Sequence, residues 1–282
     1  MDGEVAWRGN GAAMEALVAA GDVDALRRFL RHGSAANVAE PPLPRPSTNM
    51  YASADHIVLR LAPDCPPLRL VSSRVMGKVV WPAGHAVALH LCESFADRHH
   101  PSPSPPPSIF LEVGAGAGVT ALAAAAVCGR AFPLVLATDF TEAGVQLLEE
   151  NAARNHSRLR CARLDVCEEG ALCAALDAHM CDGLPRDVCI CACDMAYDEH
   201  AIERLFASAA SAAGRWRPHV WLARSSNFEH LDEHSRAVAL RHGFAVAARH
   251  RLNGCGVQDA LSMTYLNPCV DDVTDLFIFR LS

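Results

Sequence analysis

The sequence predicts a doubly wound α/β fold with a mainly parallel seven-stranded sheet, and three observations support this. Short apolar runs alternate with helical patterns from residue 109 onward, which is typical of parallel strands joined by helices. The first run, Ile109–Val113, leads directly into three alternating glycines and an alanine-rich helix. The last two runs, 243–251 and 275–281, have no helical pattern between them, so we expect an antiparallel pair.

The remaining elements of this region can be assigned in order along the chain. We expect the five parallel strands at 109–113, 134–138, 160–165, 187–193 and 219–224. We expect helices at 118–128, 141–154, 168–179, 199–213 and 229–242. Because the strands are apolar throughout, helices should cover both faces of the sheet.

The segments ahead of the sheet differ in character. Residues 1–40 carry two short helical patterns and are predicted to form a helical hairpin packed on the main domain, because a single repeat-like hairpin cannot bury its own face. Residues 41–49 are a proline-rich linker, and residues 50–80 are predicted to be a small β extension with strands at 56–61 and 68–71.

The main domain then spans 81–282 and opens with a helix over 84–97. The proline-rich stretch 101–108 is predicted to be a spacer loop, with an SH3 or WW ligand as the alternative.

Composition excludes several classes of protein. The net charge of −7 argues against a nucleic-acid binder, since such domains are usually basic. No apolar run is long enough to span a bilayer, and the start of the chain has neither the basic nor the apolar region of a secretory signal. We therefore expect a cytoplasmic monomer, with the nucleus as an alternative location.

The 12 cysteines and 14 histidines are scattered and show no metal-ligand spacing. Cys189, Cys191 and Cys193 alternate along one predicted strand, which places them on one face rather than around one point. A zinc site needs convergent ligands, so we interpret these thiols as small buried hydrophobic side chains and expect no metal.

The glycine loop after the first strand indicates a cofactor site. Gly114, Gly116 and Gly118 let the backbone turn tightly and lie close to a ligand. The dinucleotide pattern requires glycine where Val119 stands, and a phosphate-binding loop requires a lysine that is absent. The loop thus resembles neither of these nucleotide sites.

Three acidic residues are candidates for contacts with an adenosyl cofactor, and the first of them favours a cofactor with a positive charge, whereas the second is shared with NAD sites. Glu112, two residues before the first glycine, suits the ammonium and sulfonium of S-adenosylmethionine better than a pyrophosphate. Asp139 ends the second strand, 21 residues after Gly118, where a carboxylate accepts hydrogen bonds from ribose hydroxyls. Asp165, predicted to end the third strand, is a candidate acceptor for an adenine amino group, with a capping role as the equal alternative.

The fourth strand ends in Cys193-Asp194-Met-Ala-Tyr197. Ligands of open α/β sheets bind at the carboxyl ends of the strands, so Asp194 and Tyr197 should face the same crevice as the glycine loop. They are predicted to form one wall of a small polar pocket.

The order Trp81-Pro-Ala-Gly, Glu112-Val-Gly-Ala-Gly-Ala-Gly118, Thr-Asp139 and Asp194-Met-Ala-Tyr197 resembles the seven-β-strand S-adenosylmethionine-dependent methyltransferases over residues 56–282. It is most similar to the protein-lysine branch called methyltransferase family 16. The resemblance implies cofactor contacts from Trp81, Glu112, Gly114, Ala115, Gly116, Gly118, Asp139 and Asp165. It also implies that Asp194 and Tyr197 are the catalytic pair facing a lysine amine of a protein substrate, Asp194 anchoring it and Tyr197 narrowing the pocket.

Two other functions stay open at this point. A small-molecule or other-residue methyltransferase has the same fold, because fold does not determine substrate. A non-catalytic interaction module is less favoured, since it needs none of the acidic and glycine residues together. An oxidoreductase using a nicotinamide cofactor is disfavoured by Val119 and by the closing strand pair.

Overall fold

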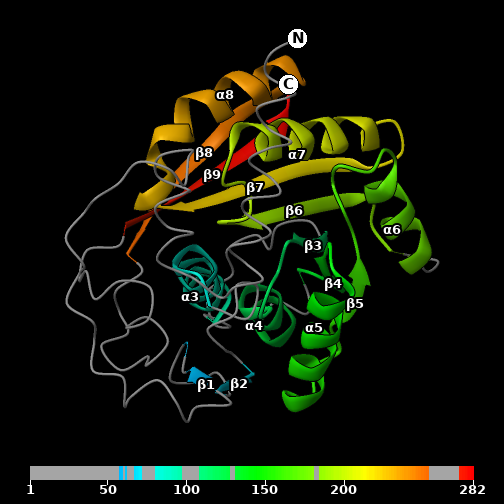
Figure 1. Ribbon diagram of the computed structural model, residues 1–282, viewed down its shortest axis with the longest axis vertical. Coiled ribbons are helices and arrows are strands. Elements are labelled where there is room, and N and C mark those ends of the chain that lie inside the picture. The colour runs from blue at the N-terminus through cyan, green and yellow to red at the C-terminus, as the bar shows by residue number, and fades with distance from the viewer. Residues whose placement is uncertain are drawn as a thin grey trace, which may run out of the picture.

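A seven-stranded sheet runs through the centre of the protein, with helices on both of its faces (Figure 1). The computed structural model describes residues 57–59, 61, 67–71, 80–96, 108–127, 131–180, 184–253 and 273–282. The predicted helical hairpin over 12–32, the linker 41–49 and most of the proline-rich loop 101–108 lie outside these residues.

The strands of the large sheet are β3 (Ile109–Val113), β4 (Leu134–Asp139), β5 (Arg160–Arg163), β6 (Asp187–Cys193), β7 (Arg217–Ser225), β8 (Phe244–Asn253) and β9 (Val273–Leu281). The helices are α3 (Pro82–Ala96), α4 (Val119–Val127), α5 (Glu142–Arg154), α6 (Ala171–His179), α7 (Glu199–Ala212) and α8 (Asp232–Arg241), with the short 3-10 helix η2 (Ser226–Leu231). These elements match the predicted order.

The strand order is β5-β4-β3-β6-β7-β9-β8. The first five strands pair in parallel, and β9 pairs antiparallel with both β7 and β8, as the absence of a helical pattern before it predicted. The chain winds outward from β3 in one direction and from β6 in the other. The two strands therefore form the switch point of the sheet, where α/β folds open a crevice at the carboxyl ends of their strands.

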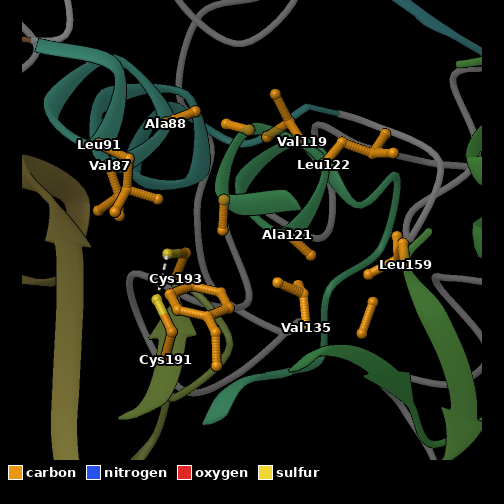
Figure 2. Packing of buried hydrophobic residues seen from close by; sticks show 14 of the residues in the cluster. Val87, Ala88, Leu91, Val119, Ala121, Leu122, Val135, Leu159, Cys191 and Cys193 are labelled. Atoms are coloured by element: carbon orange, nitrogen blue, oxygen red, sulfur yellow. Dashed lines mark hydrogen bonds between the residues drawn. The ribbon is translucent and has the colours of Figure 1, made fainter. Parts of the chain in front are cut away.

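Two apolar layers hold the helices on the sheet. One joins α3, α4 and α5 to one face, and the other joins α6, α7 and α8 to the opposite face. Figure 2 shows part of the first layer, in which Cys191 and Cys193 of β6 lie among the side chains of α3 and α4. Their Sγ atoms are 3.6 Å apart. Cys189 is buried in the same layer, so the interpretation of the three thiols as core side chains is confirmed.

A second, two-stranded antiparallel sheet precedes the main one and consists of β1 (Ile57–Leu59) and β2 (Leu68–Leu70). It corresponds to the predicted β extension. Strand β2 packs near α4 and α5, and its side chains Leu68 and Leu70 are buried in the first apolar layer. This pair of strands, together with Val71 directly after β2, is called the β arm below.

Several predicted boundaries differ from the observed ones by a few residues, and three of these differences have local reasons. Strand β5 ends at Arg163 rather than at Asp165, because the chain turns at Asp165, whose carbonyl accepts the Glu168 N–H. Helix α6 begins at Ala171 rather than at 168, after Gly170 adopts a φ of 74°. Helix α8 begins at Asp232 because η2 occupies the preceding residues.

Candidate functional site

The glycine loop leaves the end of β3 in a conformation that side chains rarely adopt. Gly114, Gly116 and Gly118 have φ of 63°, 54° and 77°, so an L-residue at any of them would be strained. At Gly118 a Cβ would also lie 2.7 Å from Leu148 Cδ2. The loop is fixed to β4 by the Ala115 N–H, which donates to the Thr138 carbonyl at 2.8 Å. The conformation of the loop is thereby fixed at the carboxyl end of β3.

Glu112 lies beneath this loop rather than on its surface. Its side chain is 2% exposed, and Oε2 accepts the Ala121 N–H of α4 at 2.8 Å. Burial raises the pKa of Glu112 to about 7, against the lowering effect of hydrogen bonds from Thr120 and Ala121. One oxygen of this carboxyl group thus ties β3 to the first turn of α4, a structural role that the sequence did not indicate. A contact with the charge of a cofactor stays a prediction.

Asp139 occupies the end of β4 as predicted and is 6% exposed. Its Oδ1 accepts hydrogen bonds from the Thr141 N–H at 3.1 Å and the Thr141 hydroxyl at 3.0 Å. Its carboxyl group also lies over the first turn of α5, where a Cβ on Gly144 would be 2.3 Å from both Cγ and Oδ1. Gly144 therefore provides the space in which this carboxylate sits.

Asp165 lies two residues beyond the end of β5, in a turn. Its Oδ1 accepts the Cys167 N–H at 2.8 Å. This is the local backbone-capping geometry that was the alternative to an adenine contact. The adenine contact itself stays a prediction.

Asp194 follows β6 with a φ of 51°, in the left-handed region that aspartate tolerates better than most residues. The side chain is 7% exposed and is held by three donors. Oδ1 accepts the Ser225 N–H at 2.9 Å and the Ser225 hydroxyl at 3.1 Å, and Oδ2 accepts the Ala83 N–H at 3.1 Å. The carboxylate thus joins the end of β6 to the end of β7 and to the first turn of α3.

This arrangement also positions Trp81, the residue directly before α3, whose carbonyl accepts the His85 N–H at 3.1 Å. Burial raises the pKa of Asp194 to about 6, opposed by the hydrogen bonds from Ser225 and Ala83 and by the charge of Arg224. Through its bond to Ala83, Asp194 holds the start of α3 against the carboxyl edge of the sheet.

Tyr197 is half-buried in the segment between β6 and α7 and packs on the second apolar layer. The next residue, Asp198, caps α7 by accepting the Ala201 N–H at 2.7 Å. The ends of β3 and β6 are close, since a Cβ on Gly114 would lie 2.9 Å from Met195 Cβ. The structure therefore brings the glycine loop and the Asp194–Tyr197 segment together at the switch point.

The family model described as lysine methyltransferase matches residues 69–214, which is more than half of the chain. The chain belongs to this family of S-adenosylmethionine-dependent methyltransferases. The matched region contains the glycine loop, Asp139, Asp194 and Tyr197. The resemblance noted from the sequence is thereby confirmed.

Solved structures of other methyltransferases are similar to this methyltransferase at low sequence identity. The tRNA (uracil-54, C5)-methyltransferase of Pyrococcus abyssi, in complex with S-adenosyl-L-homocysteine, is 11% identical over 80% of this chain and 44% of its own, with a TM-score of 0.45. TYW2 of M. jannaschii, in complex with AdoMet, is 14% identical over 82% and 89%, with a TM-score of 0.44. The ribosomal protein L11 methylase of Lactobacillus delbrueckii subsp. bulgaricus is 14% identical over 80% and 100%, with a TM-score of 0.45. The comparison with curated proteins found no match.

S-adenosylmethionine is the cofactor of this methyltransferase, and the residues present fit it. The glycine loop, with three positive φ values that glycine adopts readily, turns at the carboxyl end of β3, where folds of this kind bind their ligands. Asp139 ends β4 and has both described bonds on Oδ1, a position compatible with the predicted contact between its carboxylate and a ribose diol.

Two residues near the site were not anticipated. Ser225 was missed, although the rule that selected Asp194 also selects it, because it ends the neighbouring strand β7. Phe140 was missed as well. It follows Asp139 and is 61% exposed, an unusual exposure for an aromatic ring beside a predicted ribose site.

Two kinds of feature are absent from the described part of the chain. It holds no group of three or more histidine, cysteine, aspartate or glutamate side chains arranged to bind a metal ion. Within the same residues, no helix has the length and apolar character needed to cross a membrane.

Proposed function

We propose that this methyltransferase transfers methyl groups to a lysine side chain of a protein. The observation that carries the proposal is the match to the lysine methyltransferase family over a region that contains both the glycine loop and the Asp194-Met-Ala-Tyr197 segment. These two segments also adjoin at the switch point, through Gly114 and Met195. A cofactor and an acceptor bound there would meet at one edge of the sheet.

The cofactor side of the proposed site consists of the glycine loop, with Ala115 held by β4, and the carboxylate of Asp139. Trp81, at the start of α3, is proposed to border the same space. When bound, S-adenosylmethionine supplies an electrophilic methyl group next to a positively charged sulfur. The contribution of the chain is then mainly alignment and exclusion of water.

The acceptor amine must be neutral to react. With a pKa of about 10.4, only about one lysine side chain in 2,500 is neutral at pH 7. Asp194 is a poor candidate for the base that removes the proton, because a carboxylate with a pKa of about 6 is far weaker than the amine. Desolvation of the amine beside a positive charge favours its neutral form, and the proton leaves to solvent.

Asp194 is proposed to act mainly by holding the walls of the acceptor site. A carboxylate has about four acceptor positions, and the two N–H groups and the Ser225 hydroxyl take three of them. One position is left to orient the incoming nitrogen. Tyr197, four residues after β6, is proposed to narrow the pocket beside it.

Labelling tests the proposal directly. The purified protein is incubated with radiolabelled S-adenosylmethionine and a cell lysate, and labelled products are separated and identified by mass spectrometry. Label on protein lysine supports the proposal. Label only on small molecules, on RNA or on another amino acid contradicts it and favours the alternative substrate. The Gly116→Val variant, whose side chain should block the approach of the cofactor, is the control for contaminating enzymes.

A further inference from the structure

Two asparagines of α5 bind the backbone of the β arm in the same way. Asn155 Oδ1 accepts the Arg69 N–H at 2.7 Å, and its Nδ2 donates to the Arg69 carbonyl at 2.7 Å. Asn151 Oδ1 accepts the Val71 N–H at 2.6 Å, and its Nδ2 donates to the Val71 carbonyl at 3.3 Å. Each side-chain amide therefore pairs with both polar groups of one residue, as a neighbouring strand would.

The spacing of the two elements makes this pairing possible. Residues four apart on a helix are about 5–6 Å apart, and residues two apart on a strand are about 6.6 Å apart. Asn151 and Asn155 thus match Arg69 and Val71, while Leu70 between them is buried in the core. The pair fixes both the position and the register of β2 on α5.

The Asn151 side chain also bonds to the glycine loop, whereas the Asn155 side chain does not. Its Nδ2 also donates to the carbonyl of Ala117 at 2.9 Å, inside the glycine loop. The second Nδ2 bond of Asn155 goes instead to the Asn151 carbonyl within α5, at 2.7 Å. Asn151 is 0% exposed, so its amide joins the β arm directly to the loop in a region closed to water.

The carbonyl of Ala117 lies between Gly116 and Gly118, both with positive φ. The conformation of such a peptide is weakly restricted by its own residues, because glycine tolerates many backbone angles. Ala117 is 2% exposed, so a carbonyl deprived of the Asn151 bond would lose a partner that water cannot easily replace. Asn151 therefore helps to select the loop conformation.

We propose that Asn151 is a positioning residue for the cofactor and that it couples docking of the β arm to the conformation of the glycine loop. This rests on the placement of S-adenosylmethionine at that loop. When the arm is docked, the backbone of Val71 holds the side-chain amide of Asn151 in place. The amide then holds the glycine loop through its bond to the Ala117 carbonyl. Because coupling is reciprocal, bound cofactor should in turn hold the arm more firmly.

The test compares two alanine variants, each of which removes one of the asparagines of α5 that bind the arm. Asn151→Ala is expected to weaken S-adenosylmethionine binding roughly tenfold by calorimetry, the effect of one lost buried hydrogen bond. Asn155→Ala is expected to leave that affinity within about twofold. Equal affinities in the two variants would overturn the proposal. Failure of the unsubstituted protein to bind S-adenosylmethionine would instead overturn the placement of the cofactor.

Hydrogen exchange of peptides covering residues 67–71 gives a readout that general destabilisation does not mimic. Addition of S-adenosylmethionine at saturating concentration should slow exchange there in the unsubstituted protein and in Asn155→Ala. In Asn151→Ala the slowing should be lost. If that variant does not fold, Asn151→Asp keeps the acceptor for Val71 and removes the donor to Ala117, and it should give the same result. Retained slowing in either folded Asn151 variant contradicts the coupling.

Discussion

Replacing Glu112 by glutamine removes the charge of this buried side chain and keeps its shape. Burial raises the pKa of Glu112 from its ordinary value of 4.5 to about 7. The folded protein therefore binds this proton more tightly than the unfolded chain does. The free energy of unfolding should fall as the pH rises from about 4.5 to about 7 and should change no further from this cause at higher pH.

The magnitude follows from the difference between the two pKa values. A rise from 4.5 to about 7 corresponds to about 3 kcal/mol of stability lost on ionisation. Glutamine cannot ionise, and its side-chain oxygen can still accept the Ala121 N–H. As the pH rises from 4.5 to 8, the free energy of unfolding of Glu112→Gln should thus increase by up to about 3 kcal/mol relative to that of the unsubstituted protein. For a chain of this size the melting temperatures should diverge by roughly 6–12 °C over that range.

Scanning calorimetry of the cofactor-free proteins at several pH values between 5 and 8 measures this divergence. Glu149→Gln, which removes a carboxylate from the exposed side of α5, is the matched control for a change of net charge. A difference in melting temperature that stays constant from pH 5 to pH 8 would refute the reasoning. The unsubstituted protein and Glu112→Gln also test the predicted cofactor contact. A positively charged ligand beside Glu112 should bind more tightly when this carboxyl group is ionised. The affinity for S-adenosylmethionine should therefore rise with pH in the unsubstituted protein and not in Glu112→Gln.

Three further predictions concern Asp139 and Asp194. Gly144→Ala, which in an open helix would be stabilising, should displace the Asp139 carboxylate and weaken S-adenosylmethionine binding roughly tenfold; unchanged affinity by calorimetry would contradict the ribose assignment. Ser225→Ala removes one of the three bonds to Asp194 and should cost about 1 kcal/mol of stability in denaturant titration while lowering kcat more than it changes cofactor affinity. Asp194→Asn replaces one accepting oxygen by an NH2 group, which cannot accept a hydrogen bond from the N–H groups around it. This variant should lower kcat at least tenfold more than Ser225→Ala does. Equal values of kcat in the two variants would exclude the proposed role of Asp194 in the acceptor site.

Much of the fold could be predicted because its signals are local. The apolar runs of β3 and β6 were predicted with their observed ends, since both strands are buried on both faces and have polar or glycine residues at their limits. The glycine loop was equally visible, because its three positive φ values strongly favour glycine. Asp139 and Asp194 followed from the rule that ligands bind at the carboxyl ends of strands.

The parts that could not be predicted depend on contacts between distant segments. The hydrogen bond from Ala83 to Asp194 spans 111 residues, and that from Val71 to Asn151 spans 80. Neither asparagine of α5 belongs to a motif, so nothing near it in the sequence marks its partners. The same holds for Glu112, whose burial against α4 depends on how that helix packs on the sheet.

The bonds around Asp194 have a consequence for the order in which the site can be completed. The family match ends at residue 214, whereas Ser225, which supplies two of the three donors to Asp194, lies beyond it. A ribosome makes β7 after every element of the cofactor side. The chain order therefore places every element that holds the glycine loop ahead of the strand that supplies Ser225 to the acceptor wall.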